Sequence, residues 1–268
     1  MDTTDFQELL AERGHELYRN MPWRDDTRPY YVLVSELMLQ QTQVDRVIPK
    51  FEAFISAFPD EETLANASLA DVLTLWSGLG YNRRAKFLHE AAKKIVHNYD
   101  GVFPDIEINL LTLPGVGKNT CGAIRTYAFN KPAIFVETNV RTVYFHHFFA
   151  DGDSVDDKQI IALLEQTIDR EHPREFYWAV MDYGSWLKRN GAGRLQQSKH
   201  YKKQAALRGS VREVRGLILK YLASNGDSPL TDLSARMPDD ERFDAALGGL
   251  IRDGLIGQQK DGMIHLTK

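Results

Sequence analysis

The sequence predicts an all-α main domain followed by a small unit of three helices and a β-hairpin. Three observations support this prediction. Apolar residues recur at helical spacing through most of residues 1–187, glycines and prolines separate these runs, and strand-like alternation is scarce before residue 250. The chain has 268 residues, 43% hydrophobic and 10% aromatic, so it can bury a substantial core in one or two domains.

The helices expected in the main domain, residues 1–187, follow one another closely. The first places Phe6, Leu10 and Leu17 near a period of 3.6 residues. Helix breakers such as Pro59 and Gly101 separate later runs. In chain order, helices are expected over residues 4–19, 30–41, 43–57, 61–66, 69–78, 83–98, 106–112, 118–129, 138–149, 157–169 and 173–187.

Residues 188–210 are expected to form a basic connector. Between Lys188 and Arg215, nine Lys or Arg residues accompany a single acid, Glu213. A charge run is usually a solvated face, but so uneven a ratio also fits contact with phosphate groups. The residues singled out for such contact are Lys188, Arg189, Lys202 and Lys203.

Residues 211–268 are expected to form a separate small domain. Its first helix runs around Ile218, the second opens at Pro229, and the third contains Leu250. Two short strand-like runs then flank an Asp-Gly turn at Asp261. This order resembles a winged helix, and it leaves DNA contact and a stabilising or protein-contacting role both open.

Charge and cysteine content limit the class of protein. The formal net charge is −4, so any nucleic-acid-binding face must be local. Cys121 is the only cysteine, which excludes an internal disulfide. Residues 1–20 contain no apolar signal segment, and no apolar stretch is long enough to span a bilayer. A monomeric cytoplasmic protein without a membrane partner is expected, nucleoid-associated if the source is bacterial.

The most specific local signal is the string Leu113-Pro114-Gly115-Val116-Gly117-Lys118. Pro114 can end a helix, and Gly115 and Gly117 permit positive φ and close approach of another backbone. The residues that follow are again helical, so a helix, a tight hairpin and a helix are expected. Such a hairpin directs backbone N–H groups and a helix N-terminus outward, which suits a phosphate. Taken alone, the pattern also fits an ordinary turn between helices.

This string resembles the helix–hairpin–helix signature of base-excision DNA glycosylases, the HhH-GPD superfamily. Further strings in the expected order and spacing resemble its branch that acts on adenine opposite guanine or 8-oxoguanine. The resemblance covers roughly residues 20–187 and implies a glycosylase fold of two helical subdomains that binds double-stranded DNA. The strings are Pro22-Trp23-Arg24, Pro29-Tyr30, Ser35-Glu36-Leu37-Met38-Leu39-Gln40-Gln41-Thr42-Gln43-Val44, Leu75-Trp76-Ser77-Gly78-Leu79-Gly80-Tyr81 and Val136-Glu137-Thr138-Asn139-Val140-Arg141.

The resemblance places the catalytic acid on Glu36 and a stacking role on Gln41. A purine leaves more easily when a ring nitrogen is protonated, and a carboxyl among apolar neighbours can have a raised pKa. Gln41 would help to fill the space left by the flipped base. Without the resemblance, both residues would be read as ordinary polar positions of a helix.

The second carboxylate expected at the site is Glu137. The family has an aspartate at this position, two residues before Asn139, and uses it to stabilise positive charge on the sugar. Glutamate keeps the charge but adds a methylene group, which puts the rate or the substrate in question. A simple helix cap is the alternative for Glu137, and Asn139 is expected to support it by hydrogen bonding.

Related enzymes that also cut the DNA backbone carry a lysine where this chain has Asn119. That amine attacks the sugar to form a Schiff base. Lys118 lies one residue earlier and is expected to meet phosphate. The resemblance therefore implies a monofunctional glycosylase that uses water and has no lyase activity.

Three departures from the family matter. The four cysteines that usually hold an iron–sulfur cluster are absent, so no metal site or cofactor is expected beyond an ion at the hairpin backbone. Residues 211–268 do not resemble the C-terminal domain with which adenine glycosylases typically recognise 8-oxoguanine. Asn82 follows Tyr81 where a second tyrosine often lies, although both residues are still expected to contact DNA.

The function implied is hydrolysis of the N-glycosidic bond of a flipped base, first of all adenine opposite guanine or 8-oxoguanine. The departures leave open a glycosylase for uracil, thymine or oxidised pyrimidines such as 5-hydroxyuracil. A non-catalytic module that binds damaged DNA is the alternative of another class. It is disfavoured because a pure binder gains nothing from two carboxylates facing phosphate-rich DNA.

Overall fold

The computed structural model describes residues 2–199, 201, 205–238 and 240–267. Backbone contacts divide the chain into two compact units, each assembled from separate segments of the sequence. The first unit contains Met1–Val32, Asp105–Thr112 and Val116–Lys203. The second contains Leu33–Pro104, Leu113–Gly115 and Gln204–Lys268.

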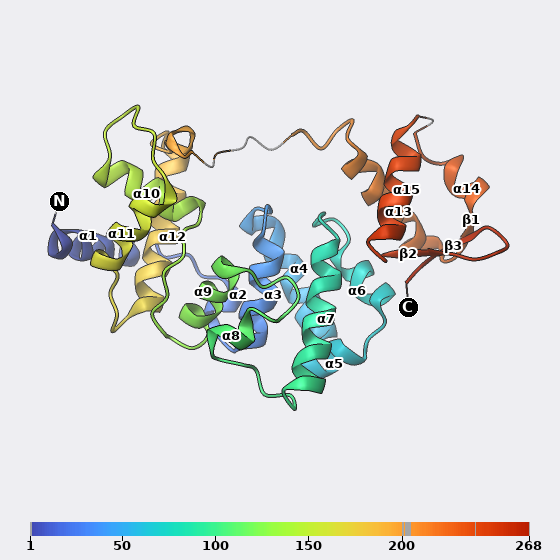
Figure 1. The fold of residues 1–268 in the computed structure, drawn as a ribbon, viewed down its shortest axis with the longest axis horizontal. Coiled ribbons are helices and arrows are strands. Elements are labelled where there is room, and N and C mark those ends of the chain that lie inside the picture. The colour runs from blue at the N-terminus through green and yellow to red at the C-terminus, as the bar shows by residue number, and fades with distance from the viewer. Residues whose placement is uncertain (1, 200, 202–204, 239, 268) are drawn as a thin grey trace. The chain divides into compact units, whose positions relative to one another are not determined.

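The first unit is helical and centres on its longest helix, α12 (Pro173–Arg189), which packs against α1 (Thr3–Glu16) and α10 (Thr138–Phe148) (Figure 1). Its core is rich in aromatic side chains, among them Phe6, Tyr144 and Tyr177. Gly14 permits the close approach of the first helix, because a Cβ there would lie 2.7 Å from the Cβ of Ala179. The elements are α1 (Thr3–Glu16), α2 (Pro22–Asp25), α8 (Glu107–Leu110), α9 (Lys118–Tyr127), α10 (Thr138–Phe148), α11 (Asp157–Thr167), α12 (Pro173–Arg189) and the 3-10 turn η1 (Leu195–Gln197).

The second unit contains a bundle around α7, which packs against α5 and α6. Phe54, Leu64 and Trp76 are fully buried in this part. Helix α3 (Pro29–Leu39) begins in the first unit and continues into the second. The other elements are α4 (Val44–Ala57), α5 (Glu61–Asn66), α6 (Leu69–Trp76), α7 (Arg83–Asn98), α13 (Val211–Asn225), β1 (Ser228–Pro229), α14 (Leu230–Ser234), α15 (Arg242–Arg252), β2 (Ile256–Gln258) and β3 (Met263–Leu266).

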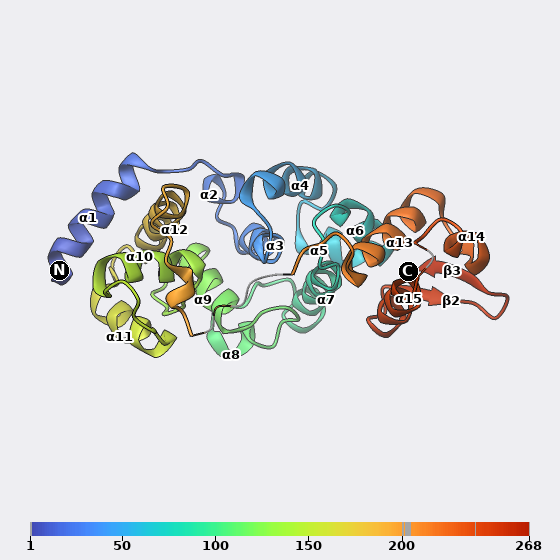
Figure 2. The same ribbon diagram turned by 90° about the horizontal axis from the view of Figure 1, so that it is seen from above.

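The C-terminal part of the second unit has the predicted three helices and β-hairpin. Strands β2 and β3 pair antiparallel, with Ile256 opposite Leu266, and Gly262 forms the turn with φ +85°. Figure 2 shows the two strands side by side. The short strand β1 completes a sheet in the order β1-β3-β2. Helix α13 packs against α15 and also against α6 of the bundle.

The mostly helical fold is confirmed, and the differences lie at the ends of elements. Helix α1 ends at Glu16, before residue 19, because the chain turns so that the backbone N–H of Arg19 reaches Asp182. Helix α6 ends at Trp76 because Gly78 adopts φ +95°. The short elements α2 and β1 were not predicted, since they are too short to produce a periodic pattern.

The start of the basic connector is folded onto the loop before α11. Val155 exchanges backbone hydrogen bonds with Gln197 and Lys199, at 2.8 and 3.0 Å. Arg194 forms an ion pair with Asp151 at 2.7 Å. Part of the positive charge expected to be free for phosphate is therefore neutralised within the protein. The limits of the three predicted domains, 1–187, 188–210 and 211–268, stay a prediction.

Candidate active site and DNA-binding surface

Glu36 lies in the middle of α3, in the part of the helix that belongs to the second unit. Val34, Leu37 and Met38 around it are fully buried, while Glu36 is partly exposed. The apolar neighbours expected from the sequence are therefore present on the same helix. The raised pKa expected for Glu36 stays a prediction.

Gln41 follows the end of α3 and protrudes from it. Its backbone adopts the left-handed conformation, with φ +58°, and its side chain is exposed. This conformation is costly for a residue with a Cβ, and strained residues of this kind cluster at functional positions. The stacking role predicted for Gln41 fits an exposed side chain held on a fixed backbone.

Tyr81 and Asn82 lie in the turn between α6 and α7. Gly78 and Gly80 adopt positive φ, and Tyr81 follows with φ +48°. Asn82 occupies the N-cap position of α7, and its side chain makes no capping hydrogen bond. Both predicted DNA-contact residues therefore lie on an irregular turn, half-exposed.

Arg84 connects these two segments, and the sequence pattern did not reveal it. The side chain is buried, yet it donates to carbonyl oxygens on both sides: Leu37 at 2.6 Å and Gly80 at 2.9 Å, among others. Burial lowers the pKa of Arg84 to about 10, so the group remains charged at neutral pH. Its charge is favourable at the C-terminal end of α3, where backbone carbonyls carry partial negative charge.

The predicted hairpin is present, and its two glycines differ. Gly115 adopts φ +81°, and a Cβ there would lie 3.0 Å from the Cβ of Phe87 and 3.2 Å from Cδ2 of Leu37. The sequence permits positive φ at Gly117 as well, but Gly117 does not use it: its φ is −91° and no atom lies within 4 Å of an added Cβ. The reason is that Gly117 is the N-cap of α9, a position with extended backbone.

The side chains of the hairpin point in different directions. Leu113 and Val116 are buried, so contact with DNA at these positions would come from their backbone groups. Lys118 is the first residue of α9 and is exposed, without an ion pair to any residue that the structure describes. Lys118 is therefore suited to a phosphate near the helix N-terminus.

Glu137 lies in the first unit, at the N-cap position of α10. Its backbone is extended, but its side chain makes no capping hydrogen bond. The cap role weighed as an alternative is thus not adopted. Burial raises the pKa of Glu137, and the positive charge of Arg141 partly offsets this effect.

Asn119 on α9 and Asn139 on α10 belong to the same unit as Glu137. Asn119 donates from its side-chain amide to the carbonyl oxygen of Val136 at 2.9 Å, the residue before Glu137. Asn139 directs its amide nitrogen at the sulfur of Met181, 3.7 Å away. The Oδ1 atom of Asn139 is buried and lacks a hydrogen-bond partner in the described parts of the chain. It is therefore an acceptor available to a ligand or water.

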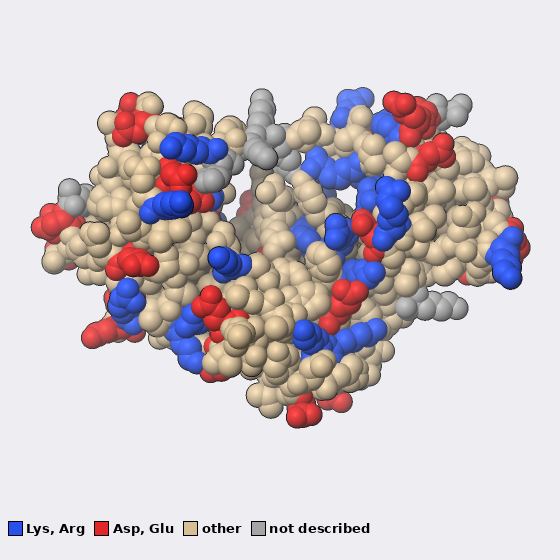
Figure 3. Space-filling view, in the orientation of Figure 1, with Lys and Arg blue, Asp and Glu red and all other residues tan. Residues whose placement is uncertain are grey.

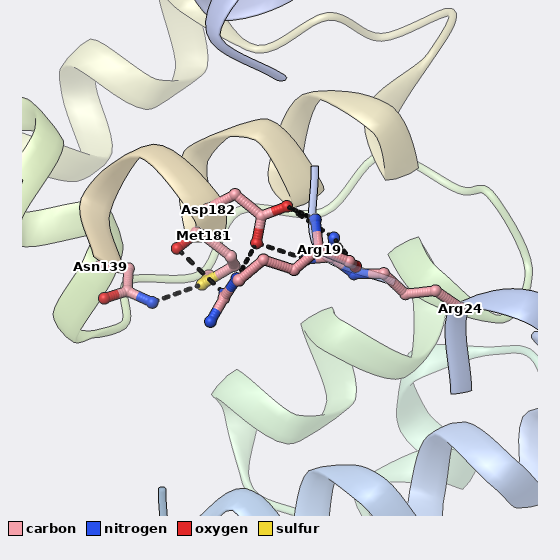
Figure 4. Close-up of polar contacts among 5 residues, drawn as sticks. All are labelled: Arg19, Arg24, Asn139, Met181 and Asp182. Carbon is pink, nitrogen blue, oxygen red and sulfur yellow. Dashed lines mark hydrogen bonds and ion pairs between the residues drawn. The ribbon is translucent and has the colours of Figure 1, made fainter. Parts of the chain in front are cut away.

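A buried ion cluster supports this region, and the sequence analysis missed it. Asp182 on α12 is 1% exposed and binds Arg24 with both oxygens, at 2.7 and 3.0 Å, and the side chain of Arg19 at 2.6 Å. Figure 4 shows these contacts next to the Met181–Asn139 pair. Because Asp182 and Met181 are adjacent on α12, the cluster fixes the helix turn that contacts Asn139. The Pro22-Trp23-Arg24 string was a signal for Arg24, but not for its partner.

The predicted basic contacts after α12 differ in exposure, and their contact with DNA stays a prediction. Arg189 is exposed at the end of α12. Lys188 is half-buried, and burial lowers its pKa, with nearby Arg19 acting in the same direction. Lys202 and Lys203 lie outside the described residues.

The residues present do not fit a cysteine-ligated iron–sulfur cluster. The only cysteine, Cys121, is buried within α9, and such a cluster takes several thiolate ligands. Among the residues that the structure describes, no three His, Cys, Asp or Glu side chains lie together as metal ligands would. No helix in the described part of the chain is long and apolar enough to cross a membrane.

Comparisons with known proteins agree with this fold. A family model described as "HhH-GPD superfamily base excision DNA repair protein" matches residues 34–170. Adenine DNA glycosylase of Mycobacterium tuberculosis is 36% identical, over 96% of this chain and 92% of that protein. Adenine DNA glycosylase of Buchnera aphidicola subsp. Baizongia pistaciae is 35% identical over 68% of this chain. That match spans only 52% of the Buchnera protein.

Two solved structures share the fold. The structure of a thermostable thymine-DNA glycosylase matches with a TM-score of 0.63 and 26% identity, over 68% of this chain and 86% of that one. A trapped endonuclease III–DNA covalent intermediate matches with a TM-score of 0.59 and 19% identity, over 69% of this chain and 87% of that one. The helical fold with its hairpin is thus that of a base-excision DNA glycosylase. Within this class, the chain belongs to the HhH-GPD superfamily, in the branch of the adenine DNA glycosylases.

Proposed function

We propose that this protein is a monofunctional adenine DNA glycosylase, which hydrolyses the N-glycosidic bond of adenine mispaired with guanine or 8-oxoguanine. The choice of adenine as the substrate base is supported by the mycobacterial adenine DNA glycosylases, which match nearly the whole chain. The chemistry is supported by Glu137, a carboxylate at a helix start that neither caps the helix nor forms an ion pair in the described structure. It is therefore available to positive charge on a sugar.

Two carboxyl groups have different tasks in this proposal. Glu36 donates a proton to a ring nitrogen of adenine as the glycosidic bond breaks, which makes the base a better leaving group. Glu137 remains ionised and stabilises the oxocarbenium-like sugar. A water molecule then adds its oxygen to C1′ of the sugar and returns a proton to the Glu36 carboxylate, which leaves an abasic site and restores the acid. The buried Oδ1 of Asn139 is an acceptor able to hold that water.

Two side chains of the second unit serve base flipping. Unstacking and extruding a base costs a few kcal/mol. In this proposal Gln41 and Tyr81, both on left-handed backbone, occupy the vacated stack. The binding partner of the protein is duplex DNA, and the protein acts as a monomer without a cofactor.

The absence of lyase activity rests on Asn119. An amide does not form a Schiff base, and the Asn119 side chain is engaged with the carbonyl of Val136. We expect that borohydride added during turnover traps no covalent protein–DNA adduct. A trapped adduct would require another amine, first of all Lys118, and would contradict the monofunctional assignment.

The function is tested with duplexes that carry A:8-oxoguanine, A:G, U:G, T:G or 5-hydroxyuracil:G, each treated with hot alkali after incubation. Strand breaks at adenine are expected in the first two. Breaks in the pyrimidine duplexes alone would overturn the assignment of adenine as the substrate. No breaks in any duplex would overturn the proposal that the protein is a glycosylase.

Glu36→Gln tests the catalytic acid. The variant should lose at least about 100-fold in single-turnover rate, because general acid catalysis contributes 10²–10⁴-fold. Its affinity for the A:8-oxoguanine duplex should stay within about two-fold of wild type, which separates catalysis from binding. Retained turnover would remove Glu36 from this role.

A further inference from the structure

The second unit contains a groove that the catalytic roles above do not use. It has a volume of about 1060 Å³ and lies between the turn that joins α6 and α7 and the exposed side of α13. Its floor is apolar, with Leu79, Phe87 and Leu217 among the lining residues. Gln41 and Tyr81 also line it, so the groove adjoins the residues proposed to enter the DNA stack.

The rim of this groove is basic. Six Lys or Arg side chains and two acids line it, and the acids are already paired. Asp253 binds Arg215 at 2.5 Å, and Glu213 lies 3.6 Å from Arg242, which is outside the groove. In the space-filling view, basic side chains gather over the region of α7 and α13 (Figure 3).

Two of the six cations are exposed and available. The side chains of Arg46 on α4 and Lys220 on α13 have no hydrogen bond or ion pair to the residues described in the structure. A surface that keeps exposed cations unpaired while its acids are neutralised favours an anionic ligand.

A third cation joins α13 to the flipping machinery. Arg212 lies 5.1 Å over the ring of Tyr81 and donates a hydrogen bond to the Tyr81 hydroxyl. It also donates to the carbonyl oxygen of Ala205 at 2.9 Å. The C-terminal part of the chain therefore contacts Tyr81, to which the proposed function assigns a role at the mispair, and holds its ring.

We propose that this groove binds the sugar–phosphate backbone of the duplex beside the mispair, so that α13 is part of the DNA interface. The identity of the polymer rests on the proposed function. When Gln41 and Tyr81 enter the stack, the adjacent backbone must pass their rim of the groove. Arg46 and Lys220 then neutralise phosphates, while the apolar floor contacts the CH groups of deoxyribose.

The salt dependence of binding tests this proposal. Affinity for a fluorescent A:8-oxoguanine duplex and for its matched counterpart is measured by anisotropy between about 50 and 200 mM NaCl. Arg46→Ala and Lys220→Ala should each weaken binding to both duplexes equally and reduce the slope of log Kd against log salt by about 1. The double variant should reduce it by about 2. Lys93→Ala, an exposed lysine of α7 that does not line the groove, should leave the slope unchanged.

The outcomes separate the groove from the proposed function. Slopes that stay at the wild-type value in the groove variants would overturn the proposal, and this is also the result expected if the groove binds an acidic protein segment. If the wild type releases no adenine but the groove variants lower the slope, the groove is a DNA site and the proposed function fails. If adenine is released and the slopes do not change, only the groove proposal fails.

Discussion

Glu137 differs from the aspartates that cap helices in this chain, and it shares the missing cap hydrogen bond with Glu241 at the start of α15. Asp2, Asp60 and Asp156 each accept a hydrogen bond from a backbone N–H of their own helix, whereas Glu137 accepts none. An N-cap residue without its hydrogen bond forfeits about 1 kcal/mol. Burial also raises the pKa of Glu137, so its ionised form is disfavoured in the folded protein. The missing cap hydrogen bond and the buried charge both lower the stability of the folded protein, and such a residue is typical of a functional position.

Glu137→Gln should therefore reduce activity and leave the protein at least as stable. Losing the carboxylate should lower the single-turnover rate by roughly 10²–10³-fold, as for other groups that stabilise transition-state charge. A pKa raised on folding means that the folded state binds more protons, so stability falls as pH rises through that pKa. The neutral amide removes this cost, and urea unfolding at pH 7 should show an equal or higher free energy of unfolding. A less stable variant would show that the carboxylate has a structural role instead.

The same pKa sets the acid limit of the reaction. Because the ionised form of Glu137 is the active one, adenine release should decline as pH falls through a value above 4.5, the ordinary pKa of a glutamate. The single-turnover rate measured from pH 4 to 8 should show this limb, on duplexes pre-bound at saturating protein. A rate that does not change down to pH 4.5 would contradict the raised pKa as the controlling group.

At the scale of elements, Arg84 joins the end of α3 to the turn before α7. Besides Leu37 and Gly80, it donates to the carbonyl oxygens of Met38 at 2.9 Å and Leu79 at 3.3 Å. The two segments that it ties together carry Gln41 and Tyr81, both non-glycine residues with positive φ. Such conformations persist only where the surroundings fix them. Arg84 is thus a positioning residue for both side chains.

Arg84→Met should destabilise the protein and impair base extrusion. Several buried carbonyl groups would lose their donor, at about 1–3 kcal/mol each if left unsatisfied, so a loss on the order of 3 kcal/mol is expected in urea unfolding. If the role is positioning, the single-turnover rate should fall on A:8-oxoguanine but recover on a duplex with adenine opposite an abasic site, where less stacking must be broken. The control is Lys93→Met, because Lys93 is exposed on α7 and does not line the groove. An equal loss on both duplexes would make the role of Arg84 purely structural.

At the scale of the whole molecule, the sequence predicts what is local and misses what is distant. Helical periodicity and helix breakers located nearly every long helix, because both depend on neighbouring residues. The hairpin was expected, but which of its glycines uses positive φ was not, since a glycine in a sequence does not reveal whether its freedom is used. Arg84 with Leu37, and Arg24 with Asp182, are 47 and 158 residues apart, and no local pattern links such partners. The supporting contacts of the site therefore required the structure.

The stability of the first unit against acid depends on His147, which lies where three helices meet. From α10, its ring lies 5.8 Å from that of Phe6 on α1, and its Nε2 lies 3.0 Å from the hydroxyl of Tyr183 on α12. Burial, and secondly the neighbouring His146, lower its pKa from 6.5 to about 4. The unfolded chain thus binds a proton below pH 6.5 that the folded chain does not accept until about pH 4. Stability conferred by His147 is complete above pH 6.5 and is lost as pH falls towards 4.

His147→Gln should therefore flatten the pH dependence of unfolding. The lowered pKa of His147 corresponds to at most about 3 kcal/mol of stability between neutral pH and pH 4. Other acid-sensitive groups contribute to the pH dependence of both proteins. The difference in free energy of unfolding between wild type and variant, measured in urea at pH 7.5, 5.5 and 4.5, isolates the contribution of His147. The free energy of unfolding of the variant, relative to that of the wild type, should rise as pH falls. His97→Gln, at an exposed position near the end of α7, should show a constant difference across the same range. If His147→Gln gives that constant difference too, protonation of another group limits the acid stability of this unit.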